Sequence, residues 1–550
     1  MINDDTPSWP FIIVVIALVA ITWFHALGQR PLAEPDEGRY AEIPREMVAS
    51  GDWLTPRLNG FKYFEKPALQ YWLTAAGFEL FGQSNAVARL WPALLGFLGA
   101  LWAGFVGLKL YGRATGFHAF LLTAGSLLYF ALGHILTLDM SFSVFMAFGV
   151  GALVLAQCRR EEAPRVSRNW MLFGWLMLGL AVLTKGLAGV VLPGAAVFLY
   201  MLWQRDWRLL RSLHLGKGVL LLLAVTAPWF FEASRQNPTF AWFFFVHEHF
   251  ERYLTTVHHR DAPLWYFAPI FLLGVMPWLV SYLRGLLAPF ASRFDGQPAG
   301  EFDAARLLWV YAVFIFVFFS LSDSKLPAYI LPITPMLAIL AGRQLAERGN
   351  PASDSLVLAL FGLFLVVVGT QAGRFATETV TQEMLHAYRI WFFGAGALMF
   401  SIGLLAWVID FRADFKVAMI ALTAMVGFSL LFAGYPTIGK TRTSRALADA
   451  IRPWLDDQTP VYSVGIYPQS LPFYLKRKVR LVQYKGELEM GIDLEPVRYI
   501  ATVDKFLPRW QAADRAIAVL GAEDAKALGL SILGGRVIYQ DEARVAVVKP

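Results

Sequence analysis

Long apolar segments separated by short charged ones fill the first four-fifths of the chain. A helix needs about 20 apolar residues to cross the hydrocarbon core of a bilayer. Windows of that length predict thirteen membrane-spanning helices, at 9–27, 88–111, 115–135, 138–157, 170–184, 187–203, 217–233, 265–283, 306–321, 327–345, 355–372, 389–409 and 415–434. The first run follows a segment without Lys or Arg and is long for a signal peptide, so we interpret it as an uncleaved span.

Lys and Arg gather in every second loop, which indicates the orientation. With a cytoplasmic N-terminus, the basic loops that include Arg113, Arg160, Arg208, Arg284, Arg343 and Arg412 lie inside. The short loops on the other side are nearly free of positive charge. The positive-inside rule therefore predicts a cytoplasmic N-terminus, and an odd number of spans places the C-terminus outside.

Three outer segments are longer than the rest: residues 28–86, residues 233–262 and the tail from residue 435. The tail combines a helical stretch, "TSRALADAIRPWL", with strand-like runs such as "PVYSVG", "KVRLVQ" and "RAIAVLG". This alternation predicts a compact α/β domain. We therefore divide the chain into a transmembrane domain, residues 1–434, and an outer α/β domain, residues 435–550.

The composition agrees with a multi-pass membrane protein. Hydrophobic residues make up 57% of the chain and charged residues 16%, against roughly 25% charged in soluble proteins. Cys158 is the only cysteine, which excludes an intrachain disulfide. The chain has no zinc finger, no Walker loop and no dinucleotide fingerprint, and nothing indicates nucleic acid binding.

The first outer segment opens with "AEPDEGRYAEIPREM", where two carboxylates, Asp36 and Glu37, follow directly on the first span. Its apolar positions recur with helical spacing, at Tyr40, Ile43, Met47 and Val48. They predict a helix that lies flat on the membrane, with its charged face towards water: Arg39, Glu42, Arg45 and Glu46. Pro44 predicts a kink or a restart in that helix.

A second interfacial helix is predicted in "NGFKYFEKPALQYWLTAAGFELFG", with Pro67 in its first turn. Glu65 and Lys66 come just before it. Simpler roles exist for these charges: Asp36 can cap the first helix, and Glu65 and Lys66 can form an ordinary interfacial ion pair. However, carboxylates at membrane level are costly and tend to mark function, so the cluster favours a site.

The stretch "DEGRYAEIPREMVASGDWLTPRLNGFKYFEKPALQYW" resembles the first extracytoplasmic loop of the bacterial aminoarabinose transferases. They belong to the GT-C superfamily of polyprenyl-phosphate-sugar glycosyltransferases, together with the protein O-mannosyltransferases. The adjacent acidic pair is typical of the superfamily, and "SKLPAYILPITP", residues 324–335, is a second similarity. Ala68 departs from the pattern, which has a second proline there.

This resemblance implies a multi-pass protein of the bacterial inner membrane with its active site and C-terminal domain in the periplasm. It implies inverting transfer of 4-amino-4-deoxy-L-arabinose from undecaprenyl phosphate to a lipid A phosphate. Sugar transfer would neutralise the negative charge of the lipid A phosphates and so weaken the binding of cationic antimicrobial peptides. The resemblance therefore also implies resistance to polymyxin and other cationic peptides. The expected partners are the lipid-linked donor, lipid A and membrane lipids, with no nucleic acid, and we expect a monomer.

Two alternatives stay open. Related transferases use another sugar or a protein hydroxyl as acceptor. A flippase for lipid-linked sugars belongs to a different class, but a transporter is expected to place its polar groups at the bilayer midplane. Here the charges gather at the outer face, which favours an enzyme.

Three groups of residues form the predicted site. The catalytic group is Asp36, Glu37 and Asp139. The group that binds the donor phosphate is Lys66, Arg252, Lys325 and Tyr329, because a phosphate leaving group needs fixed cations. The group that binds the rest of the substrate is Arg39, Tyr40, Tyr63, Glu65 and His249.

Some of these residues have simpler explanations. Lys325 can extend to the interface from a helix end, Arg252 can be a solvated loop charge, and Asp139 can make a structural hydrogen bond. Asp36 fits a general base for a hydroxyl acceptor. A phosphate acceptor is already largely ionised, so Asp36 or Glu37 could instead orient the charged 4-amino group of the sugar, or hold the acceptor through a bridging group.

Histidines in the second outer segment raise the question of a metal. His247, His249, His258 and His259 do not have the spacing of a zinc motif. A divalent ion near Glu65 and His249 is a weaker alternative. Since Lys and Arg can supply the positive charge, we expect no required cofactor and no metal.

Overall fold

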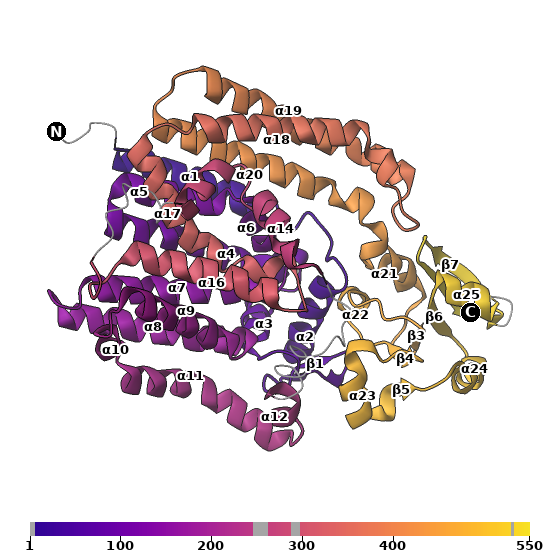
Figure 1. Cartoon of the computed structure of the whole chain (residues 1–550). Coiled ribbons are helices and arrows are strands. Elements are labelled where there is room, and N and C mark those ends of the chain that lie inside the picture. Colours follow the sequence, from indigo (N-terminus) through magenta and orange to yellow (C-terminus); the bar gives the residue numbers. More distant parts are fainter. Residues whose placement is uncertain (1–5, 246–261, 288–297, 530–532, 550) are drawn as a thin grey trace.

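The computed structural model describes residues 6–245, 262–287, 298–529 and 533–549. Most of it is a bundle of long helices, and a smaller α/β unit lies at one end of the bundle (Figure 1). The bundle contains α1 (Trp9–Phe24), α4 (Asn85–Tyr111), α5 (Arg113–Ala124), α6 (Leu127–Gly133), α7 (Asp139–Cys158), α8 (Pro164–Lys185), α9 (Ala188–Gln204), α10 (Leu209–Ser212) and α11 (Leu215–Gln236). It continues with α12 (Phe240–Trp242), α14 (Phe267–Gly274), α15 (Leu279–Leu287), α16 (Ala304–Leu321), α17 (Ile333–Arg348), α18 (Ala352–Thr370), α19 (Gln382–Val408) and α20 (Ala413–Ile438).

A helical segment lies at each of the thirteen positions predicted from hydropathy. Among the described residues, eight helices are long and apolar enough to cross a membrane, and the pair α5–α6, bent by 63°, makes a ninth. α7 is central, with 89% of its apolar window buried, whereas α11 is peripheral, with 17% buried. The multi-pass helical fold is therefore confirmed.

The first outer segment folds into α2 (Asp36–Ser50), a hairpin of β1 (Arg57–Leu58) and β2 (Phe61–Lys62), and α3 (Leu69–Phe81). α2 ends at Gly51, whose φ of +72° is a left-handed conformation that suits glycine. The helix runs through Pro44 without a restart.

The predicted orientation of α2 was wrong, because its charged face does not meet water. Glu42, Arg45 and Glu46 are each no more than 5% exposed. Arg45 donates to both carboxylate oxygens of Glu42 at 2.6 Å. The cover comes from the C-terminal domain, which lies on this face and contacts Glu46 through Lys478.

The C-terminal domain is built on a six-stranded sheet with the order β5-β4-β3-β6-β8-β7. β3 (Val461–Val464), β4 (Arg480–Val482), β5 (Tyr499–Ile500) and β6 (Ala516–Gly521) are parallel, while β7 (Arg536–Gln540) and β8 (Arg544–Lys549) run antiparallel to their neighbours. The helices are α21 (Arg445–Ile451), α22 (Leu471–Leu475), α23 (Glu489–Leu494), α24 (Val503–Ala512) and α25 (Ala522–Leu528). The predicted α/β character is confirmed.

One apolar core joins the outer loop to this domain. It contains Leu58, Phe61 and Tyr63 from the loop together with Leu471 and Val479 from the domain, all of them buried. At its edge the side chain of Asn59 exchanges two hydrogen bonds with the backbone of Val479, at 2.8 and 2.9 Å. The loop that carries the predicted site is therefore packed against the C-terminal domain.

Glu46 makes this interface sensitive to pH. Its carboxylate accepts a hydrogen bond from the amide of Gly60 at 2.8 Å and lies 3.4 Å from Nζ of Lys478. Burial raises the pKa of Glu46 to about 8, and the negative charge of Glu42 adds to the shift. The folded protein therefore keeps this proton in a range where an unfolded glutamate, with a pKa of 4.5, has lost it.

Folding stability should consequently fall as the pH rises from about 4.5 to about 8, because the folded state binds one proton more than the unfolded state in that range. Glu46→Gln cannot ionise, so we expect it to unfold at a higher temperature than the wild type at about pH 9 and at a similar temperature near pH 5. Thermal unfolding in detergent at the two pH values measures this. A difference between the proteins that is independent of pH would contradict the assignment.

Candidate active site

Glu37 lies at the centre of a buried ionic cluster at the outer end of the bundle. Arg30 binds both of its carboxylate oxygens, at 2.6 and 3.0 Å, and Arg89 binds both at 2.7 and 2.9 Å. The backbone amides of Ala33 and Leu136 donate to the same carboxylate at 2.7 and 3.0 Å. The cluster therefore ties the segment before α2 to α4 and to the turn before α7.

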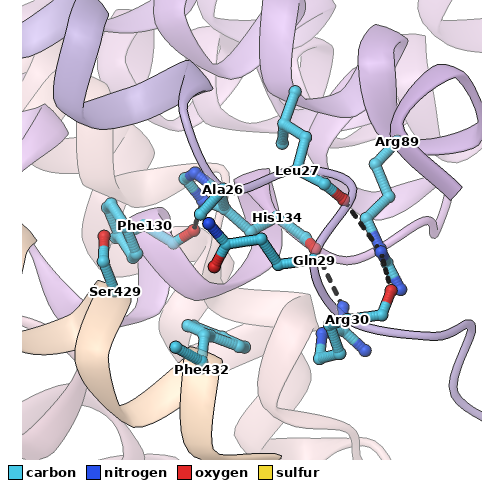
Figure 2. Close-up of a pocket in the computed structure, with 10 residues that line it drawn as sticks. Ala26, Leu27, Gln29, Arg30, Arg89, Phe130, His134, Ser429 and Phe432 are labelled. Atoms are coloured by element: carbon cyan, nitrogen blue, oxygen red, sulfur yellow. Dashed lines mark hydrogen bonds between the residues drawn. The ribbon is translucent and has the colours of Figure 1, made fainter.

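The two arginines also donate hydrogen bonds to the backbone around them. Arg89 donates to the carbonyl oxygens of Leu27 and Arg30, and Arg30 donates to that of His134. Figure 2 shows these three contacts at the edge of a small cavity lined by Phe130 and other residues of neighbouring helices. Arg30, Glu37 and Arg89 are all at least 94% buried, since none exceeds 6% exposure.

These contacts favour a structural role for Glu37 in place of the predicted catalytic one. Burial opposes its ionisation, but the charges of Arg89 and Arg30 outweigh burial and hold its pKa far below the usual range. A carboxylate that is permanently ionised and bonded on every side has no free oxygen for a substrate. Of the adjacent acidic pair, only Asp36 can then face the substrate.

Asp36 begins α2, and its side chain is 53% exposed. It does not cap the helix, because the N-cap residue is Pro35 and no side-chain capping bond forms. Its carboxylate lies 3.8 Å from Nη1 of Arg39. Arg39 also donates to the hydroxyl of Tyr63 at 3.2 Å, and its guanidinium lies 5.9 Å from the centre of that ring.

Three buried tyrosines surround this acid–base pair: Tyr40, Tyr63 and Tyr71. The rings of Tyr40 and Tyr71 stack at 6.1 Å. Burial raises the pKa of Tyr40, and the charge of Asp36 raises it further. Within the described residues, the buried hydroxyl of Tyr71 has no hydrogen-bond partner. Sequence reasoning did not single out Tyr71, although it lies in the quoted motif.

A second group lies at the outer ends of α7 and α8. Asp139, the first residue of α7, forms an ion pair with Lys185, the last residue of α8. The ammonium of Lys185 also lies 5.0 Å from the ring centre of Tyr329 and 5.5 Å from that of Phe142. The structure therefore brings the predicted Asp139 and Tyr329 together through a lysine that was not predicted to be functional. Its position as the lone cation of a short outer loop was the available signal.

The two predicted phosphate-binding lysines are held by backbone groups. Lys66 is half-buried and donates to the carbonyl oxygen of Glu65 at 2.7 Å. Lys325 is buried and donates to the carbonyl oxygen of Ser322 within its own turn. Lys325 therefore does not extend into water as a free interfacial lysine would.

Arg252 and His249 were predicted to bind substrate, and both lie outside the described residues, as do His247, His258 and His259. Across the part of the chain that the structure describes, no three His, Cys, Asp or Glu side chains are grouped so that they could hold a metal ion.

Comparison with known families covers both parts of the chain. Residues 9–244 match the family model for dolichyl-phosphate-mannose-protein mannosyltransferase, and residues 447–549 match that for the aminoarabinose transferase C-terminal domain. The fold is also similar to the oligosaccharyltransferase AglB from Archaeoglobus fulgidus, with a TM-score of 0.53 at 11% identity. The chain is thus a multi-pass glycosyltransferase of the GT-C type.

The undecaprenyl phosphate-α-4-amino-4-deoxy-L-arabinose arabinosyl transferase of Edwardsiella ictaluri is 30% identical over 522 residues, which cover 90% of each chain. The chain belongs to the aminoarabinose transferase family. The enzyme of the same name from Erwinia tasmaniensis is 34% identical over 355 residues, and this match spans 62% of that relative's length. ArnT from Cupriavidus metallidurans, at 34% identity and 98% coverage of both chains, has TM-scores of 0.90 in the apo state and 0.92 bound to undecaprenyl phosphate.

Proposed function

We propose that this chain transfers 4-amino-4-deoxy-L-arabinose from undecaprenyl phosphate to a phosphate of lipid A. The observation that carries the proposal is the pair of Asp36 and Arg39 on the outer loop that also contains Lys66, in a chain that is similar over 98% of its length to ArnT bound to undecaprenyl phosphate. The donor named for the relatives supplies the substrate class.

The reaction proceeds by displacement at the anomeric carbon of the sugar. An oxygen of the acceptor phosphate forms the new bond to this carbon while the bond to the donor phosphate oxygen breaks, with inversion. Undecaprenyl phosphate leaves with the electron pair of the broken bond. Its growing negative charge needs fixed cations close by, a role that fits Lys66, and Lys185 beside Tyr329 offers a further cation.

Asp36 does not need to act as a base in this reaction. A phosphate monoester has its second pKa near 6, so the acceptor is already a nucleophilic anion near neutral pH. We propose that Asp36 holds the 4-ammonium group of the sugar. The half-exposed carboxylate at the start of α2 can reach a ligand, which its buried neighbour Glu37 cannot.

We propose that the protein lies in the bacterial inner membrane as a monomer, surrounded by membrane lipids, with its N-terminus in the cytoplasm. The active site and the C-terminal domain then face the periplasm. The distribution of Lys and Arg among the loops supports this orientation. Removal of negative charge from lipid A would give resistance to polymyxin and other cationic peptides.

We further propose that the reaction needs no metal and no other cofactor, because Lys66, Lys185 and Arg39 can supply the positive charge. Prolonged treatment with EDTA should therefore leave the rate of sugar transfer by the purified protein unchanged. Loss of activity with EDTA, restored by a divalent ion, would support instead the metal alternative near Glu65 and His249.

The proposal is tested with the purified protein in detergent, a donor labelled in its sugar, and lipid A. We expect label covalently attached to lipid A. A flippase would leave all label on the donor, because transport has no meaning without a membrane. Transfer from a donor with another sugar, or to a peptide hydroxyl in preference to lipid A, would support the related transferases instead.

A further inference from the structure

The loop that follows β3, residues 465–470, occupies an unusual place in the C-terminal domain. β3 lies between β4 and β6, and all three strands are parallel. β4 follows β3 in the chain on one side, and β6 comes later on the other side, so the strand order reverses at β3. In open α/β sheets, ligands bind beside the carboxyl ends of the strands at such a point.

In this protein the start of α2 occupies that position. A Cβ atom on Gly38 would lie 2.5 Å from the backbone nitrogen of Ser470, so the two backbones are in direct contact and only glycine fits. Glu34, two residues before the first residue of α2, is held as well. The carboxylate of Glu34 accepts hydrogen bonds from the hydroxyls of Ser470 and Ser444, at 2.6 and 2.5 Å.

The same loop contacts a residue of the active site. Nε of Arg39 donates to the side-chain oxygen of Gln469 at 2.9 Å. The side-chain nitrogen of Gln469 donates in turn to the carboxylate of Glu487, which also accepts from the hydroxyl of Tyr484 at 2.9 Å. The amide of Gln469 is therefore aligned between a cation and an anion, and Glu487 sets which end of the amide faces Arg39.

We propose that the C-terminal domain is a working part of the active site: Gln469, oriented by Glu487, is a positioning residue that directs the guanidinium of Arg39 towards a substrate phosphate. This inference rests on the proposed function, which supplies a phosphate on the donor and another on the acceptor.

The geometry of Arg39 supports this role. Nε of Arg39 donates a hydrogen bond to Gln469 and Nη1 donates one to the hydroxyl of Tyr63. Nη2 makes no hydrogen bond within the described part of the chain. A guanidinium that is fixed at Nε can still present N–H groups of its planar edge to an anion. Arg suits phosphate because these N–H groups can form two parallel hydrogen bonds with it. Gln469, which orients Arg39, lies 430 residues away from it in the sequence. The site is therefore complete only when the C-terminal domain is docked.

The test is the rate of sugar transfer by the full-length Gln469→Ala protein, with donor and lipid A concentrations varied separately. Loss of a hydrogen bond to a charged group should lower kcat/KM by about ten-fold or more for the substrate whose phosphate Arg39 binds. A rise in KM for lipid A assigns the acceptor phosphate, and a rise in KM for the donor assigns the donor phosphate.

Two further variants separate positioning from general loosening of the interface. In an Arg39→Ala background, Gln469→Ala should cause no additional loss, because both changes act through one guanidinium. Glu495→Gln is the matched control: Glu495 pairs with Arg57 at 2.6 Å across the same interface but does not contact Arg39. This variant should keep wild-type kcat/KM, and Glu487→Leu should behave like Gln469→Ala.

The inference is overturned if wild-type protein transfers the sugar and Gln469→Ala does so with unchanged kcat/KM. Equal losses in Gln469→Ala and Glu495→Gln would also overturn it, since they would indicate a merely structural interface. The inference is likewise overturned if the losses of kcat/KM caused by Arg39→Ala and Gln469→Ala add up in the double variant. If the wild type itself transfers no sugar, the failure is that of the proposed function.

Discussion

Glu37→Gln is expected to destabilise the protein by about 3–5 kcal/mol, because removal of one partner from a buried ion pair leaves an uncompensated charge. Here the loss leaves Arg30 and Arg89 together in a region almost without solvent. Neither guanidinium can lose its proton to relieve the repulsion, because an arginine stays charged in proteins. The backbone amides of Ala33 and Leu136 also lose their ionised acceptor.

Thermal unfolding of the purified variant in detergent measures this effect, and the neighbouring residue provides the control. Asp36→Asn changes an adjacent carboxylate to its amide in the same way, but at a side chain that is 53% exposed and 3.8 Å from its partner. Exposed pairs contribute about 1 kcal/mol or less, so this variant should unfold close to the wild type. Equal unfolding temperatures for the two variants would contradict the structural role of Glu37.

Asp36→Asn should instead lose activity, by about 10²-fold or more in kcat/KM, because a carboxylate in contact with the reacting sugar contributes on that scale whether it moves a proton or binds a charge. The rate of sugar transfer to lipid A by the purified variant measures the loss. Its normal unfolding temperature would show that the loss is not one of folding. Wild-type activity in this variant would remove Asp36 from the site.

A donor with a hydroxyl in place of the 4-amino group distinguishes the two roles of Asp36. If Asp36 binds the ammonium, the wild type prefers the amine donor, and Asp36→Asn loses this preference. If Asp36 is a general base, the substitution lowers transfer from both donors by the same factor. Discrimination that survives in Asp36→Asn would therefore eliminate ammonium binding.

The sequence allowed prediction of features that depend on local pattern. Apolar runs located the long helices of the membrane domain, and strand-like runs located most strands of the C-terminal sheet. β5 was not predicted, because it is only two residues long. Asp36, Arg39, Tyr40, Tyr63, Glu65 and Lys66 could be assigned to one site because they lie within a single loop.

Features that depend on contacts between distant parts of the chain could not be predicted. The periodicity of α2 suggested that its charged face meets water, but Glu42 and Glu46 are covered by a domain that begins about 400 residues later. The partner of Glu37 on α4 is 52 residues away, and Gln469 is 430 residues from Arg39. No local pattern indicates that Lys185 will meet Asp139 and Tyr329.

Mass spectrometry of lipid A tests the central claim most directly. Lipid A is compared from bacteria that lack an aminoarabinose transferase of their own but make the lipid-linked donor, with and without this chain. We predict a mass increment equal to one aminoarabinose residue, attached at a phosphate, in cells with the wild-type chain and its absence in cells with Asp36→Asn. Unmodified lipid A in cells with the folded wild-type protein, or the increment of a different sugar, would contradict the account.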